Sequence, residues 1–181
     1  MDDVVNFDAV EPESLDDLRH ALLDQLAYLV DEVEALRTVV ASVPPDVQAG
    51  RPTPADLTMK EIYGLIATLD RDVRPAQVQQ VADGDAPALV PPNPDRLARE
   101  SGWNDRAMAD ILTDVQAARR AFVERLRDLP LGAWTEPATY DGDDVTLAEL
   151  LHRYARADLD RLRDLGYRLH DADLSDREPS P

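Results

Sequence analysis

The strongest constraint on the fold is a helical repeat of apolar residues near the end of the chain. Between Thr146 and Leu169 the apolar residues recur every three or four positions, so they fall along one face of a helix. Thr146 and Glu149 have the spacing of a capping box, in which each side chain satisfies a free backbone N–H of the other residue. At 1.5 Å per residue this helix would be roughly 36 Å long. One apolar face of this length is expected to pack against other helices.

Three further stretches have the same helical spacing. The first follows a predicted N-cap at Ser14 and is stopped by Pro44-Pro45. The second opens with a Thr58/Glu61 capping box and reaches Pro75, which is expected to end or kink it, with a short helical piece to follow.

The third predicted helix starts at Asn104 or Asp105 and ends before Pro130. Between the second and third helices, residues 83–94 have no periodicity and are long enough to travel the height of a bundle. Directly after them, Asp95 could cap one helical turn. We find no convincing strand with two-residue alternation. The sequence therefore predicts an all-α fold, a four-helix bundle with one long crossover loop.

The predicted layout is one domain, which suits a chain of 181 residues. Residues 1–13 are expected to be an acidic lead-in and residues 14–170 the bundle. Residues 171–181 are polar, contain two prolines and are expected to be a flexible tail.

Charge and composition restrict the partners. The net charge is −18, from 37 acidic and 19 basic residues, so the surface repels phosphate backbones and no nucleic acid partner is expected. Lys60 is the one lysine, and the acidic composition is interpreted either as a GC-rich genome or as adaptation to high salt. The absence of cysteine excludes disulfides and thiolate chemistry. With neither a signal peptide nor a long apolar run, no membrane association is expected, and the predicted location is cytoplasmic.

The order of helices and junctions resembles the DinB-like superfamily, also called DinB/YfiT-like metalloenzymes. The features that carry the resemblance are a helix opened by Thr-x-x-Glu at Thr58, a long crossover, and the strings "ESGWND", "LRDLP" and "VTLAELLHRYARADLDRL". They cover roughly residues 15–169. The resemblance implies a DinB-like four-helix bundle and, in members of known activity, thiol-dependent transfer or isomerisation.

The resemblance also implies a divalent metal such as zinc or nickel, held by one histidine on the second helix and two on the last. In this chain the matching positions are Leu65, Ala157 and Arg161, none of which is a metal ligand. His152 has Arg156 four residues later, so no histidine pair forms there. We therefore expect the three-histidine metal site to be lost, with no cofactor in its place.

Arg161 has two interpretations, because an inward-facing arginine must be paired or reach water. The favoured one is an ion pair with Asp70 or another acid on a neighbouring helix. In the other, Arg161 beside Tyr154 and Tyr63 binds a carboxylate or phosphate in the former metal pocket. The predicted ligand pocket therefore consists of Tyr63, Leu65, Tyr154, Ala157 and Arg161.

Other chemistry-bearing residues favour ordinary structural roles. No Gly-x-Ser-x-Gly, P-loop or Gly-x-Gly-x-x-Gly string occurs. His152 is expected to lie on the surface. The tryptophans at helix junctions, Trp103 and Trp134, are expected to cover the core. A carboxylate metal site is disfavoured because the acids of helices two and four are expected to be solvated; these are Asp70, Asp72, Asp158 and Asp160.

Two functions from different classes remain. The first is a binding module for a small anionic molecule or a protein partner, with homodimers common in such folds. The second is a metal-dependent thiol transferase or hydrolase of the superfamily with non-standard ligands. Catalysis without metal, by ordered water and carboxylates, is a third hypothesis.

Overall fold

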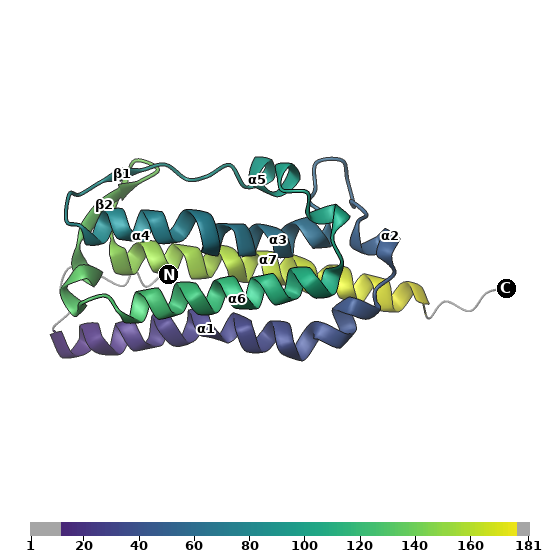
Figure 1. Ribbon diagram of the computed structural model, residues 1–181, viewed down its shortest axis with the longest axis horizontal. Helices are drawn as coiled ribbons and strands as arrows, with labels where there is room; N and C mark the ends of the chain where they lie inside the picture. The colour runs from purple at the N-terminus through teal and green to yellow at the C-terminus, as the bar shows by residue number, and fades with distance from the viewer. Residues whose placement is uncertain (1–11, 177–181) are drawn as a thin grey trace, which may run out of the picture.

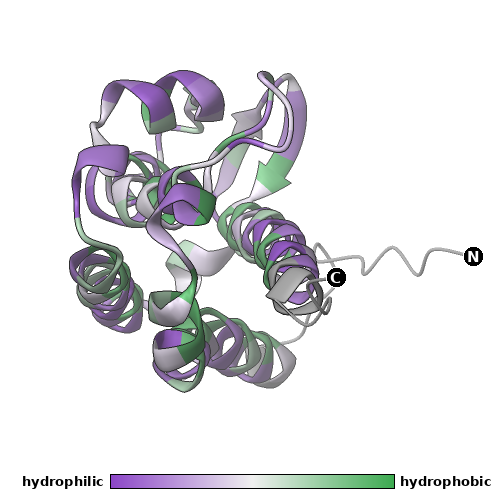
Figure 2. Cartoon of the chain, turned by 90° about the vertical axis from the view of Figure 1, so that its right-hand side faces the viewer, coloured by the Kyte–Doolittle hydropathy of each residue, from purple (hydrophilic) through white to green (hydrophobic). Residues whose placement is uncertain are grey.

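The computed structural model describes residues 12–176, in which four long helical rods pack side by side (Figure 1). Helix α6 packs against α1 and α3, and α7 packs against α1, α3 and α4. The end-on view shows the short helices and the crossover segment outside the four rods (Figure 2). The predicted all-α four-helix bundle is confirmed. The rods are α1 (Pro12–Ser42), the continuous α3 (Met59–Thr68), η2 (Leu69–Val73) and α4 (Arg74–Ala82), then α6 (Met108–Arg127) and α7 (Leu147–Asp176).

Both predicted capping boxes are confirmed. At α3 the backbone N–H of Glu61 donates to Thr58 Oγ1 at 3.0 Å, and the backbone N–H of Thr58 donates to Glu61 Oε2 at 2.9 Å. At α7 the backbone N–H of Thr146 donates to Glu149 Oε2 at 2.7 Å, with the reciprocal bond at 3.3 Å. Both helix starts therefore satisfy backbone donors that would otherwise be orphaned.

Several predicted boundaries were wrong. Helix α1 begins at Pro12 rather than after Ser14, and proline suits a first turn because its missing N–H has no helical partner there. Helix α5 (Pro94–Glu100) is capped by Asn93, whose side chain accepts from the backbone N–H of Arg96 at 2.9 Å, and not by Asp95.

Helix α6 begins at Met108, because the preceding 3-10 turn η3 (Trp103–Asp105) ends in an extended residue. Helix α7 continues to Asp176, through part of the range predicted as a tail. Residues 1–11 of the expected lead-in and residues 177–181 of the expected tail lie outside the described residues.

Short elements at one end of the bundle include strands that the sequence analysis did not find. Strand β1 pairs in parallel with β2, and β2 pairs antiparallel with β3. Asp141 and Gly142, with φ of 56° and 87°, form the tight turn between β2 and β3. Strands of two to four residues are too short to show alternation. The short elements not yet bounded are α2 (Pro45–Gln48), β1 (Ala88–Leu89), η4 (Leu131–Thr135), β2 (Pro137–Tyr140) and β3 (Asp143–Thr146).

Pro75 does not end the second rod. The π-helical turn η2 lies immediately before Arg74-Pro75, and the helix then continues to Ala82. A wider turn is one way for a helix to accommodate a proline ring and its missing N–H. Asp70 in this turn and Arg74 directly after it are both buried, whereas Arg71 and Asp72 in the turn are exposed. The turn thus directs two charged side chains into the bundle.

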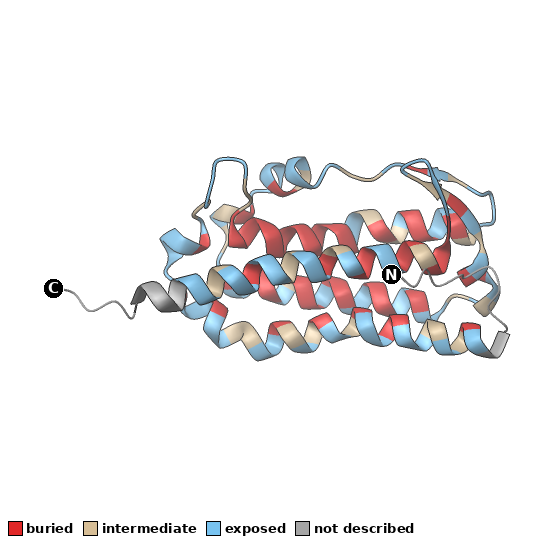
Figure 3. Ribbon diagram, turned by 180° about the vertical axis from the view of Figure 1, so that it is seen from behind, coloured by how far each residue is buried: buried red, intermediate tan, exposed pale blue. Residues whose placement is uncertain are grey.

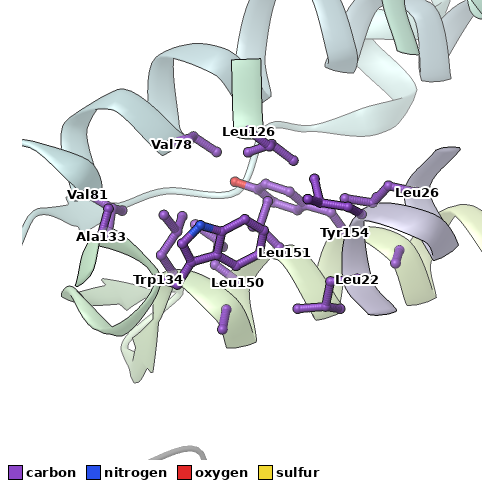
Figure 4. Close-up of a cluster of buried hydrophobic side chains, with 14 of the residues drawn as sticks. Leu22, Leu26, Val78, Val81, Leu126, Ala133, Trp134, Leu150, Leu151 and Tyr154 are labelled. Carbon is purple, nitrogen blue, oxygen red and sulfur yellow. The ribbon is translucent and has the colours of Figure 1, made fainter. Parts of the chain in front are cut away.

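The described core has two large apolar clusters and a small third one, and red buried segments run along the rods in Figure 3. The cluster near the sheet includes Trp134 and Tyr154, whose rings lie among leucines in Figure 4. The other cluster includes Trp103 and Tyr63. Both tryptophans are buried, as predicted. No helix among residues 12–176 is long and apolar enough to cross a membrane.

Candidate functional site

Two aspartates and two arginines lie between the apolar clusters and form what we call the buried ion cluster: Asp70, Arg74, Arg119 and Asp158. Arg74 donates to Asp70 at 2.7 Å and to both oxygens of Asp158 at 2.7 and 2.8 Å. Arg119 donates to Asp70 at 2.6 Å and to Asp158 at 2.5 Å. All four side chains are at most 4% exposed, so the four charges compensate one another almost without water.

The cluster joins three of the four rods by its aspartates and arginines and touches the fourth through the backbone. Asp70 and Arg74 come from the second rod, Arg119 from α6 and Asp158 from α7. Arg119 also donates to the backbone carbonyl of Leu26 in α1 at 3.2 Å. Burial alone would raise the pKa of Asp158, but Arg74 and Arg119 outweigh it and hold that pKa well below its usual value.

Beside this cluster is a cavity of about 280 Å³, which we call the arginine pocket. Its walls come from η2, α4, α7, β2 and the crossover segment. Among the residues that the structure describes, no carboxylate lines it, although the chain as a whole carries a net charge of −18. The apolar lining residues are Leu69, Val73, Pro91, Pro92, Pro94 and Ala157, and the polar ones are Arg74, Gln77, Tyr140, Arg153, Tyr154 and Arg161.

Aromatic and amide side chains organise one wall of the arginine pocket. The Arg74 guanidinium lies over the Tyr154 ring, 4.9 Å from its centroid. The Tyr154 hydroxyl donates to Gln77 Oε1 at 2.5 Å, and Gln77 Nε2 donates to the Val90 carbonyl of the crossover segment at 3.2 Å. Tyr140 meets Tyr154 edge to face. Burial raises the pKa of both tyrosines, so both keep their hydroxyl protons at neutral pH.

Arg161 lies at another wall and is only partly paired. Its Nη1 donates to Asp158 Oδ1 at 3.1 Å, and its side chain is 23% exposed. Among the side chains described, residues 14–171, its Nε and Nη2 have no hydrogen-bond acceptor. Burial lowers the pKa of Arg161, with a smaller opposing contribution from Asp158. The predicted ion pair with an acid of a neighbouring helix was wrong, because the partner is Asp158, one turn earlier on the same helix.

The structure brings together three of the five residues predicted for the ligand pocket. Tyr154, Ala157 and Arg161 line the arginine pocket. Tyr63 instead belongs to the apolar cluster with α1, and Leu65 packs against Leu69 and Ala98. Both side chains are buried, and neither lines the pocket.

The expectation that the aspartates are solvated was right for Asp72 and Asp160, which are exposed, and wrong for Asp70 and Asp158. The sequence analysis also missed Arg74 and Arg119. A signal for Arg119 was present, because it follows Val115 by four residues and precedes Phe122 by three, on the apolar face of α6.

Donor chemistry does not favour a metal in this region. Ala157 and Leu65 have no donor atom and Arg161 is a cation, while Asp70 and Asp158 are occupied by two or more arginines each. Among the side chains that the structure describes, residues 14–171, no three of His, Asp or Glu gather as a metal would require. His20, His152 and His170 are exposed and lie outside this region.

Comparison with solved structures decides the fold. The chain is similar to YfiT from Bacillus subtilis, described as a probable metal-dependent hydrolase with an unusual four-helix bundle topology, with a TM-score of 0.67. The fold is DinB/YfiT-like. The match covers 94% of this chain and 91% of YfiT at 10% sequence identity, so the likeness to YfiT is one of fold alone. No family model and no curated protein matches the sequence.

Proposed function

We propose that this chain is a DinB-like protein without the three-histidine metal site, and that it binds a small anionic molecule in the arginine pocket. The observation that carries the proposal is a cavity that, among the described residues, is lined by three arginines and no carboxylate in a strongly acidic chain. Such a lining lowers the free energy of a bound anion.

Arg161 is the residue proposed to contact the anion. It contributes a cationic side chain with unused N–H donors, in a pocket where Ala157 and Tyr154 leave room beside it. A hydrogen bond between charged groups contributes about 1.5–3 kcal/mol, so its loss lowers affinity about tenfold or more.

Isothermal titration with acetate and inorganic phosphate tests this proposal. We expect Arg161→Ala to weaken binding of whichever anion the wild type binds by about tenfold or more. Arg163→Ala is the matched control, since Arg163 lies on the same helix and pairs with Asp160 three residues earlier, outside the pocket. Loss of stability in Arg161→Ala with unchanged binding would leave Arg161 with a structural role only.

The likeness to YfiT supports a second candidate, a metal-dependent hydrolase or thiol transferase with non-standard ligands. Elemental analysis of the purified protein after dialysis separates the two. Zinc or nickel retained in stoichiometric amount supports the enzyme, and metal-free protein that still binds an anion supports the binding module.

A further inference from the structure

We infer that the occupant of the arginine pocket is a monocarboxylate with a small apolar body, an inference that rests on the proposed anion-binding function. Three observations on the pocket walls specify this chemistry: the balance of charges, the unused edge of one guanidinium, and the apolar character of the remaining surface.

The charges around the pocket leave a surplus of one positive charge. Asp70 and Asp158 carry two negative charges against three positive charges on Arg74, Arg119 and Arg161. Arg153 is compensated separately by Asp143, at 3.1 Å. One bound negative charge balances this set. The second charge of a dianion would be partly desolvated without a partner, which is costly.

The unpaired N–H groups of Arg161 favour a carboxylate. Its bond to Asp158 uses Nη1 alone, so Nε and Nη2 remain as one side of the guanidinium fork. Two parallel N–H groups match the two oxygens of a planar carboxylate. Arg161 also borders a second cavity, but Asp56, Asp95, Asp160 and Asp164 line that cavity and disfavour an anion there.

The rest of the arginine pocket suits hydrocarbon. Leu69 and Val73 of η2 and Ala157 of α7 face three prolines of the crossover segment across the cavity. Prolines add apolar surface with little backbone freedom to lose on binding. A cavity of about 280 Å³ is at the small end for ligand sites, which favours a body of a few carbon atoms or one ring.

Titration calorimetry with a graded set of probes tests the inference: acetate, butyrate, hexanoate, benzoate, succinate, inorganic phosphate and benzamide. We expect affinity to rise about fourfold per methylene from acetate until the pocket is filled. Benzoate should bind at least about tenfold more tightly than succinate, phosphate or uncharged benzamide.

Two variants locate the binding. Arg161→Gln should weaken benzoate about tenfold or more, whereas Arg163→Gln should not change it. Ala157→Leu extends into the apolar part of the pocket and should weaken hexanoate and benzoate while sparing acetate. Thermal melts identify a variant that fails to fold, and each of the two pocket variants tests the site independently of the other.

The outcomes separate this inference from the function beneath it. Tighter binding of phosphate or succinate, or affinity that does not change with chain length, would overturn the monocarboxylate while leaving an anion-binding pocket. No binding of any anion by the wild type, or equal binding by Arg161→Gln and Arg163→Gln, would overturn both.

Discussion

Glu61 and Asp158 are both buried carboxylates held by arginine, yet they draw their partners from different distances along the chain. Glu61 accepts from Arg51 at 2.5 Å, from the backbone N–H of Thr58 at 2.9 Å and from Asn104 at 3.0 Å. We call these four residues the Glu61 network. Two of its members stand within ten residues of Glu61. Asp158 has one local partner, Arg161, but its two buried partners Arg74 and Arg119 are 84 and 39 residues away.

Glu61 and Asp158 also differ in the groups whose hydrogen bonds and charges they satisfy. Glu61 satisfies a backbone donor at a helix start, a need that every helix has. Asp158 satisfies two buried arginines, a need that exists only because those arginines are there. Removing Glu61 therefore leaves the buried backbone N–H of Thr58 without its acceptor, but removing Asp158 leaves buried positive charge without compensation.

The largest expected effect comes from breaking the buried ion cluster. Asp158→Ala should lower the free energy of unfolding by about 3–5 kcal/mol, because Arg74 and Arg119 lose a shared partner. Chemical denaturation measures it. Replacing all four members together by Leu or Met should be close to neutral or stabilising. A destabilised fourfold variant with a small effect of Asp158→Ala would reverse this interpretation of the cluster.

Gly64→Ala tests the packing that holds the distant member of the Glu61 network. A β-carbon on Gly64 would lie 2.2 Å from ring atoms of Trp103, the residue before Asn104. We expect a loss of about 2–3 kcal/mol, since over-packing outweighs the usual gain from alanine in a helix.

Gly166→Ala in α7 is the matched control for that substitution. Among the described residues, no atom beyond the adjacent residues and the nearby backbone of α7 lies within 4 Å of its added β-carbon, so thermal unfolding should show a gain of up to about 1 kcal/mol. A gain at both glycines would mean that Trp103 moves aside freely.

Glu61→Gln should have a smaller effect, a loss of about 1–2 kcal/mol. The amide oxygen of Gln can still accept the Thr58 N–H, but its bond to Arg51 loses one charge. Urea denaturation at neutral pH checks this value. A loss as large as that of Asp158→Ala would remove the distinction between local capping and long-range charge pairing.

Acidification should show a difference between Glu61 and Asp158 in the pH at which each stops stabilising the fold. Burial would raise the pKa of Glu61, but Arg51 and Thr58 outweigh it, so its folded pKa lies below the usual 4.5. The folded pKa of Asp158 likewise lies below its usual 3.8. Groups with a depressed folded pKa stabilise the fold above the unfolded pKa, and this stabilisation is lost as pH falls toward the folded pKa.

The stability difference between wild type and Glu61→Gln should therefore shrink below about pH 4.5, and that between wild type and Asp158→Asn only below about pH 3.8. Urea unfolding at pH 7, 4.5 and 3.5 follows both differences. Differences that widen on acidification would contradict the depressed pKa values.

Sequence reasoning predicted what depends on neighbouring residues. Both capping boxes and the four amphipathic rods follow from spacing over a few turns, and Arg161 stood out because it falls where a bundle helix usually has an apolar residue. The structure places Tyr154, Ala157 and Arg161 together because they share one face of α7.

What the sequence did not reveal depends on how separate rods align. Asp70 could be recognised as buried only once the turn at η2 directed it toward Arg119 of α6. Tyr63 was misplaced relative to the pocket because it packs in the apolar cluster with Leu29 and Val33 of α1. No local pattern fixes the rotation of one rod against another.

The crossover segment above the arginine pocket is fastened on both sides. Near its start, β1 is paired to β2, where the carbonyl of Leu89 accepts from the backbone N–H of Asp141 at 3.2 Å. Near its end Asn93 caps α5, and between these points Gln77 donates to the carbonyl of Val90. A molecule that passed through this side would have to break these hydrogen bonds first. Deuterium exchange at the Asp141 amide would measure how often this route opens.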